Sequence, residues 1–304
     1  MRILITGGTG FIGDSLTGLL AERGHEVTVL TRAVRKGYVL PRGASILQGN
    51  PTLAGPWQDG VADHDVVINL AGASIFSYWS QGNRQKILDS RLLTTRNVVH
   101  ALASRKAGET HLLSISGVGY YGHHGDEILD EDSPPGDDFL AQVALQWERE
   151  ALIAREHNVR VVICRLGHVL GRERGMLPRL VTAHRFRIGG TWGNGQQWLS
   201  WIHKQDLMET LLFLLEHREI SGPINVTAPN PVRNRDMARL MNKALNRTLF
   251  IPSIPAFILK LTLGDFAGVF LNGQRALPRN LTGHGYRFRY PSMEEAFKDL
   301  LGHP

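Results

Sequence analysis

The residues with the clearest chemical meaning are three glycines near the start of the chain. Gly7, Gly10 and Gly13 recur at G-x-x-G-x-x-G spacing in ITGGTGFIG, between a short apolar run and a helical pattern. Glycines in that context allow a tight turn and let a pyrophosphate approach the backbone, and the helix N-terminus adds amide donors. We expect a bound dinucleotide to contact Gly7, Thr9, Gly10, Phe11, Ile12 and Gly13. A flavin, a nucleoside and a turn without a ligand are the alternatives that these residues leave open.

The end of the second apolar run indicates which dinucleotide is preferred. It finishes in Thr31 and Arg32, with Arg35 and Lys36 close behind. A carboxylate at this place would bind the ribose hydroxyls of NAD and repel a 2′-phosphate, whereas a guanidinium binds phosphate. Thr31 and Arg32 therefore favour NADP(H) over NAD, the alternative being that these are ordinary surface cations.

The elements that must position this loop follow from hydrophobic patterning. Short β-branched runs alternate with helical patterns, and runs such as DVVINLAG are almost continuously apolar, as in strands covered on both faces. The pattern predicts an α/β fold, a Rossmann-type doubly wound parallel sheet. The expected strands lie at 2–6, 26–30, 45–48, 66–70, 112–116 and 160–164, and the expected helices at 11–22, 84–103 and 139–156.

The later part of the chain differs in character. We expect residues 1–170 to form the cofactor-binding domain, with its sheet and helices completed by about 200–228. Residues 171–199 and 229–304 would form a smaller, mainly helical substrate-binding domain over the carboxyl ends of the strands. In it, the apolar stretch 254–271 is interrupted by Lys260 and Asp265, which predicts a packed helix and no membrane span. Ser292 is a candidate N-cap for the last helix.

Composition narrows the class of ligand. The formal net charge is +6, with a concentration of arginines over 172–187, so an anionic partner is expected unless these residues form a solvated face. No nucleic-acid docking motif is recognisable, which favours a small anionic molecule over DNA or RNA.

No CxxC or HExxH motif occurs in the sequence, which has one cysteine and 13 histidines, so we expect no metal site. The single cysteine, Cys164, lies in an apolar run and is expected to be a buried structural thiol. No signal-peptide pattern precedes the first strand, so a cytoplasmic location is expected.

The motifs ITGGTGFIG, INLAG, SISGVGYYG and RLGHVLG resemble the extended short-chain dehydrogenase/reductase superfamily. DSRLLTT, SWIHKQD, NPVRN and GQRALP are more similar to its atypical branch, the epimerase family proteins with a C-terminal domain of unknown function. The resemblance implies a monomer or homodimer and a catalytic role for Ser116, with Gly167 near the nicotinamide. It also implies cofactor contacts from Asn69, Leu70, Ala71, Gly72 and Arg91.

One departure from that superfamily bears on activity. The helix after the Ser116 strand normally carries Y-x-x-x-K, whose tyrosine is a general acid/base and whose lysine lowers its pKa. Here Phe139 and Val143 occupy the two places, or Leu140 and Ala144 one residue later. Two tyrosines just after Ser116 could replace the missing pair; the alternative is that they pack beneath the second domain. These are Tyr120 and Tyr121.

Two functions therefore compete. The first is an NADP(H)-dependent oxidoreductase or epimerase acting on an anionic, phosphorylated or nucleotide-linked small molecule, with Trp201 and Arg275 as substrate contacts. The second is a non-catalytic NADP(H)-responsive binding or regulatory protein, which the missing tyrosine and lysine favour.

Overall fold

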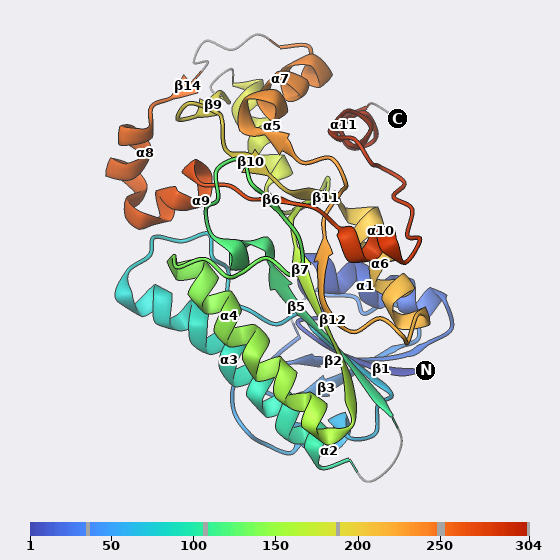
Figure 1. Ribbon diagram of the computed structural model, residues 1–304. Coiled ribbons are helices and arrows are strands. Elements are labelled where there is room, and N and C mark those ends of the chain that lie inside the picture. The colour runs from blue at the N-terminus through green and yellow to red at the C-terminus, as the bar shows by residue number, and fades with distance from the viewer. Residues whose placement is uncertain (35–36, 106–108, 187–188, 248–252, 303–304) are drawn as a thin grey trace.

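The protein is built on a parallel sheet of seven strands in the order β12-β7-β5-β4-β1-β2-β3 (Figure 1). The computed structural model describes residues 1–34, 37–105, 109–186, 189–247 and 253–302. Because the chain leaves β1 toward β2 on one side and returns to β4 on the other, the strand order reverses beside β1, where such sheets bind ligands. The strands are β1 (Arg2–Thr6), β2 (Glu26–Thr31), β3 (Ala44–Gln48), β4 (Val66–Asn69), β5 (Thr110–Gly117), β7 (Val159–Leu166) and β12 (Gly222–Val226).

Helices cover both faces of the sheet. Successive residues of a strand point to opposite faces, so Ile3 and Ile5 join a core with Leu16 of α1, while Leu4 joins a second core with Val98 of α3. All of these side chains are fully buried, as continuous apolar strands require. The flanking helices are α1 (Phe11–Glu22) and α6 (Lys204–Glu216) on one face and α2 (Trp57–Val61), α3 (Gln81–Ala103) and α4 (Phe139–Leu152) on the other. The predicted doubly wound α/β fold is confirmed.

A third core lies beyond the carboxyl ends of the strands (Figure 1). It contains Trp201, Met237 and Phe297 and belongs to a mainly helical C-terminal region. Ser292 caps its last helix as predicted, in a reciprocal capping box with Glu295. The helices of this region are α5 (Leu177–Arg185), α7 (Asn234–Leu245), α8 (Ala256–Leu263), α9 (Gly268–Leu271), α10 (Arg279–Gly283) and α11 (Met293–Leu301).

Short paired strands and single-turn helices complete the molecule. The short strands are β6 (Ile128–Leu129), β8 (His168–Leu170), β9 (Thr191–Trp192), β10 (Trp198–Leu199), β11 (Trp201–His203), β13 (Val232–Arg233), β14 (Ser253–Ile254) and β15 (Arg275–Ala276). The 3₁₀ turns are η1 (Val118–Tyr121), η2 (Ile153–His157) and η3 (Gly264–Ala267). The helix expected over 139–156 thus ends at Leu152 and continues as η2.

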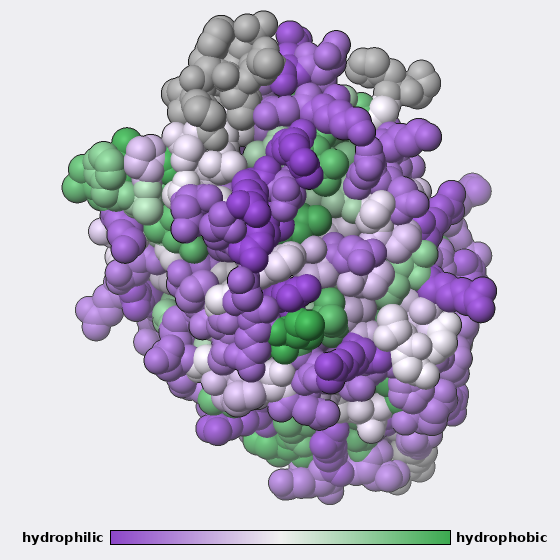
Figure 2. Space-filling model, turned by 45° about the horizontal axis from the view of Figure 1, so that its top comes forward, coloured by the Kyte–Doolittle hydropathy of each residue, from purple (hydrophilic) through white to green (hydrophobic). Residues whose placement is uncertain are grey.

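The apolar stretch 254–271 is not the single packed helix that its composition predicts. It divides into α8, η3 and α9; α8 ends at Leu263, and the following Gly264 has a φ of +58°, which is favourable only for glycine. Only Leu259 of α8 is buried, whereas Phe257 and Leu261 are 69% and 84% exposed. An apolar patch is visible at the upper left of Figure 2. No helix among the described residues is long and apolar enough to cross a membrane.

Cys164 has the structural role expected of it. Its side chain on β7 is fully buried, and burial raises the pKa of the thiol to about 12. A thiol that stays protonated at neutral pH is a poor nucleophile, so Cys164 contributes to packing.

Candidate functional site

The glycine loop packs backbone against backbone, at distances that leave no space for side chains on its glycines. Gly7 has a φ of +69°, and a Cβ on it would lie 3.0 Å from the amide nitrogen of Ala71. A Cβ on Gly13 would lie only 2.4 Å from the carbonyl oxygen of Gly7. Gly10 is the N-cap of α1, and no side chain caps the helix there. The first amides of α1 therefore remain available to an anion, which is the arrangement that a dinucleotide pyrophosphate requires.

Buried polar side chains fix the neighbouring loop after β4. Asn69 is fully buried; its Oδ1 accepts a hydrogen bond from Thr6 at 2.7 Å, and its amide donates to Thr95 at 2.8 Å. The hydroxyl oxygen of Thr6 accepts the backbone N–H groups of Leu70 and Ala71, each at 3.2 Å. The Asn69 side chain thus holds the loop of residues 70–72 beside the glycines.

Arg91 is a cation without a carboxylate partner among the described residues. One terminal nitrogen donates to the carbonyls of Ala73 and Ile87 at 3.1 and 2.9 Å, and its guanidinium lies 5.1 Å from the ring centre of Trp147. Burial lowers the pKa of Arg91 to about 10, so it is still charged at neutral pH. Because this charge lines a cavity and lacks a described carboxylate partner, it favours an anion there.

Arg32 lies directly after β2 and is exposed. Thr31 donates its hydroxyl to the Ala33 carbonyl at 3.1 Å, and no described side chain pairs with Arg32. The predicted support from Arg35 and Lys36 falls outside the described residues. Arg32 is thus free to reach a phosphate at the edge of β2.

A cavity of about 610 Å³ connects the start of α1 with the C-terminal region. It lies at the carboxyl ends of β5 and β7. Of the predicted site residues, Phe11, Ile12, Arg91, Ser116 and Gly167 line it. Further lining comes from Ile75, Phe76, Trp79, Arg84, Val118, Gly119, Asp138, Trp147, Leu166, His168, Val169, Gly175, Met176, Asp265, Gly268, Val269, Asn272 and Gln274.

The positions of the absent tyrosine and lysine also line this cavity. Phe139, Leu140, Val143 and Ala144 all face it from α4. The Phe139 ring lies 5.0 Å from that of Trp79, in an edge-on contact. In either of the two registers, α4 places only hydrocarbon side chains against the cavity, at the positions where the superfamily has a tyrosine and a lysine. Any proton transfer must therefore come from another element.

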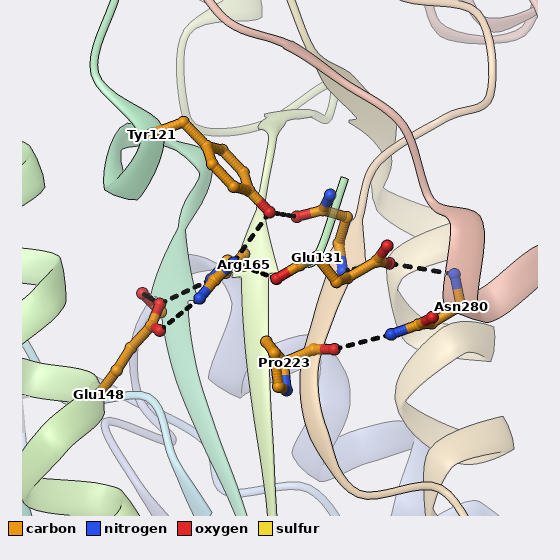
Figure 3. Close-up of polar contacts among 8 residues, drawn as sticks. Tyr121, Glu131, Glu148, Arg165, Pro223 and Asn280 are labelled. Atoms are coloured by element: carbon orange, nitrogen blue, oxygen red, sulfur yellow. Dashed lines mark hydrogen bonds and ion pairs between the residues drawn. The ribbon is translucent and has the colours of Figure 1, made fainter. Parts of the chain in front are cut away.

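A buried ion pair lies behind Ser116. Ser116 donates its hydroxyl proton to Glu148 at 2.7 Å, and Arg165 binds the two oxygens of the same carboxylate at 2.9 and 2.8 Å (Figure 3). Both charged side chains are almost fully buried, with 6% and 3% exposure. No sequence motif singles out this pair. The available signal was a buried-face acid, Glu148, on a helix that also carries Glu150, and an arginine at the end of an apolar strand.

Tyr121 belongs to this network, away from the cavity in which its predicted proton exchange with a substrate would take place. It is fully buried; its hydroxyl donates to Asn225 Oδ1 at 2.6 Å and accepts from Arg165 at 3.0 Å (Figure 3). Burial raises the pKa of Tyr121. Tyr120 packs its ring 3.5 Å from the Arg165 guanidinium, and neither tyrosine lines the cavity. The pair packs against Ala276 of the C-terminal region, which is the alternative considered above.

The network continues into the C-terminal region through Glu131. Its Oε1 accepts the backbone N–H groups of Asn225 at 3.0 Å and of Asn280 at 3.2 Å, and the Asn280 amide donates to the Pro223 carbonyl (Figure 3). Burial raises the pKa of the Glu131 carboxyl. Polar contacts from Glu131 and Pro223 to Asn280 thus join the end of the sheet to α10 of the C-terminal region.

The two predicted substrate contacts lie outside the cavity. Trp201 is fully buried in the C-terminal core, where its indole N–H donates to the Asn230 carbonyl at 3.0 Å. Arg275 places its guanidinium 4.5 Å from the ring centre of Trp198 and does not line the cavity, although its neighbour Gln274 does. The physical reason is that Trp201 supplies apolar area to a core, whereas Arg275 turns toward Trp198 and away from the cavity that Gln274 lines.

Comparisons with known proteins agree with this architecture. The family described as NAD dependent epimerase/dehydratase matches residues 3–227, and the domain of unknown function DUF1731 matches residues 254–300. The epimerase family protein YfhF of Bacillus subtilis is 39% identical over 302 residues, which are 99% of this chain and 98% of that protein.

Solved structures of similar proteins share this architecture. The crystal structure of human epimerase family protein SDR39U1 with NADPH superimposes with a TM-score of 0.84 at 33% identity, and the match covers 99% of both chains. A nucleoside-diphosphate sugar epimerase from Corynebacterium glutamicum gives a TM-score of 0.79 at 33% identity; that match covers 99% of this chain and 58% of the other.

Proposed function

The chain belongs to the NAD dependent epimerase/dehydratase family, and we propose that it is an NADP(H)-dependent oxidoreductase acting on a small anionic molecule. The observation that carries the proposal is the cavity that joins the glycine loop at Phe11 to Ser116 and to the C-terminal region. The structure of a 33% identical human relative with NADPH supports the choice of cofactor, as does an unpaired Arg32 at the place where NAD sites need an acid.

Each part of the cofactor has a group that could hold it. The backbone of residues 7–13 would bind the pyrophosphate, and Arg32 the 2′-phosphate. The backbone of residues 70–72 lies beside the glycine loop, and Gly167 lies on the cavity wall for the nicotinamide end. When bound, NADPH supplies a hydride.

The remaining volume suits a substrate with a flat apolar part and a negative charge. Trp79, Phe139 and Trp147 supply aromatic surface, and Arg91 supplies a positive charge that pairs with none of the described carboxylates. Arg84 contributes no net charge, because it pairs directly with Asp265 of η3, which also lines the cavity. Residues 171–199 and 229–304 would act as the substrate domain, since Asp265, Asn272 and Gln274 come from them.

Ser116 would orient the substrate oxygen. Its own proton is directed to Glu148, so its lone pairs are free to accept a hydrogen bond from a substrate hydroxyl. Glu148 and Arg165 do not line the cavity and act through Ser116 as positioning residues.

A second candidate is an NADP(H)-responsive binding protein that performs no chemistry. The observation that favours it is the apolar lining at Phe139, Leu140, Val143 and Ala144, where the usual acid/base group and its cation are missing. In that case cofactor binding would alter the contacts made by the C-terminal region. A cytoplasmic location and a monomeric or homodimeric state accompany both candidates as predictions.

One experiment separates the two candidates. NADPH affinity is measured by fluorescence titration, and NADPH oxidation is then followed with nucleotide sugars, sugar phosphates and para-carboxybenzaldehyde. The last probe combines an aromatic ring, a carbonyl and an anionic group, as the cavity suggests. Oxidation with any of them supports the oxidoreductase. Tight NADPH binding with no oxidation across the set favours the binding protein.

A further inference from the structure

The cavity contains one histidine for which neither the fold nor the ion-pair network gives a role. His168 directly follows Gly167 as the first residue of β8, and it lines the cavity together with Ser116. We propose that His168 exchanges the proton with the reacting oxygen of the substrate, replacing the tyrosine that α4 lacks. This inference rests on the proposed oxidoreductase function.

The backbone around His168 is rigidly held. Its N–H donates to the Ser200 carbonyl at 2.8 Å, and β8 pairs in parallel with β11, with His168 opposite Trp201. A Cβ on the preceding Gly167 would lie 2.7 Å from that same Ser200 oxygen, so the two strands are in close contact. A rigid backbone limits where the imidazole can lie, which favours a defined position for proton transfer.

The other charged groups lining the cavity are already engaged or cannot titrate near neutral pH. Arg84 and Asp265 pair with each other, and Asp138 caps α4 by accepting the Ala141 N–H at 2.9 Å. Arg91 remains a cation at neutral pH. Among the described lining residues, His168 is the one group whose ordinary pKa lies near neutrality, and its imidazole has no hydrogen-bond partner in the described parts of the chain.

The charged side chains of β11 and of the first turn of α6, the elements packed against β8, are engaged elsewhere. Asp206 of α6 accepts the backbone N–H groups of Arg289 and Tyr290 at 2.8 and 2.9 Å. His203 of β11 faces Asp299, with 3.3 Å between Nε2 and Oδ2, and Lys204 of α6 faces Glu173 at 3.3 Å. None of these four lines the cavity. Burial alone lowers the pKa of His168 below its ordinary 6.5, so the imidazole is neutral at pH 7.

The protonation state fixes the direction of the pH dependence. A neutral imidazole accepts the hydroxyl proton of an alcohol as its hydride leaves for NADP⁺, which yields the carbonyl and an imidazolium that returns its proton to water. In the reverse direction the imidazolium gives its proton to the carbonyl oxygen, so that carbonyl, hydride and proton together give the alcohol. Oxidation should therefore rise with pH through the pKa of His168, and reduction should fall.

The test uses the whole protein with NADPH and para-carboxybenzaldehyde. We expect His168→Asn to lower kcat/KM by about 10²–10⁴, the usual loss of a general acid. NADPH affinity should remain unchanged, and the pH inflection below 6.5 should disappear. His100→Asn, at an exposed position of α3, is the matched control and should keep both rate and profile. His168→Gln repeats the test if the asparagine variant does not fold.

Three outcomes are decisive. Loss of rate together with loss of the inflection supports the proposal. A variant that binds NADPH and keeps the wild-type rate or inflection overturns the role of His168 and leaves the oxidoreductase function standing. If the wild-type protein binds NADPH but oxidises it with none of the carbonyl compounds, the oxidoreductase function fails, and the role of His168 fails with it. Histidine NMR gives a separate readout: a His168 resonance that does not respond to the aldehyde in NADP⁺-loaded protein also overturns the proposal.

Discussion

Ser116 and Glu148 share a hydrogen bond of 2.7 Å in which the serine is the donor. The direction matters because a hydroxyl that gives its proton to a carboxylate can offer only lone pairs to a second partner. Glu148 is itself fixed by Arg165, so the orientation of Ser116 depends on a charge pair that never reaches the cavity. The serine therefore acts as an acceptor, and the proton must be handled elsewhere.

The Glu148–Arg165 pair should contribute strongly to stability. Glu148→Ala leaves the Arg165 guanidinium charged and almost fully buried without its partner, which should lower the free energy of unfolding by about 3–5 kcal/mol. Urea unfolding followed by circular dichroism measures this loss. The matched control is Glu294→Ala, which removes an exposed partner of Lys243 and should leave the urea midpoint unchanged. Equal midpoints for the two variants would contradict the importance of the buried pair.

Tyr121→Phe should affect folding and leave chemistry intact. The substitution removes a hydroxyl that bonds to Asn225 and Arg165 in a buried site, and a lost buried hydrogen bond costs about 1–3 kcal/mol. The expected result is a lower unfolding free energy with unchanged NADPH affinity and turnover. Tyr78→Phe, at a residue that is 65% exposed, is the control and should leave the unfolding free energy, the NADPH affinity and the turnover unchanged. A large fall in turnover without a stability change would restore Tyr121 as a proton donor.

Arg32→Asp should reverse the choice of cofactor. The variant would lose the charge-assisted contact that the Arg32 guanidinium, at the end of β2, would make to the 2′-phosphate. Such a contact is worth about 1.5–3 kcal/mol, or about tenfold to a hundredfold in Kd. NADPH should therefore bind more weakly, and NADH as well as before or better, in fluorescence titrations. Arg42→Asp, at another exposed position, is the control. A wild-type protein that binds NADH and NADPH equally would exclude the assigned role of Arg32.

Gly13→Ala should abolish dinucleotide binding. Its methyl group would meet the Gly7 carbonyl oxygen at 2.4 Å, so the loop and α1 must separate. We expect loss of NADPH binding in titration calorimetry and a lower melting temperature. Gly82→Ala provides the contrast, since a Cβ there has no atom within 4 Å and lies in the exposed first turn of α3. That change should raise stability by up to about 1 kcal/mol and leave binding intact.

The sequence alone determined the features that depend on neighbouring residues. The spacing of Gly7, Gly10 and Gly13, the alternation of apolar strands with helices and the capping by Ser292 are all local, because turn geometry and helix caps are set within a few residues. The absence of the tyrosine and lysine from α4 is equally readable, since it needs only the helix and its register. These local signals were enough for the fold class and the expected dinucleotide loop.

Tertiary structure decided what the isolated polar and aromatic side chains do. Tyr121 meets Asn225 across 104 residues, and Arg165 meets Glu148 from a different element, so neither contact has a signature in either segment alone. Whether Trp201 or His168 faces a core or a cavity depends on how β8 and β11 lie against the C-terminal region. The spacing of apolar residues along a helix or strand shows which of its faces is apolar. Only the packing of distant elements determines which buried polar groups find partners and which are left facing open space.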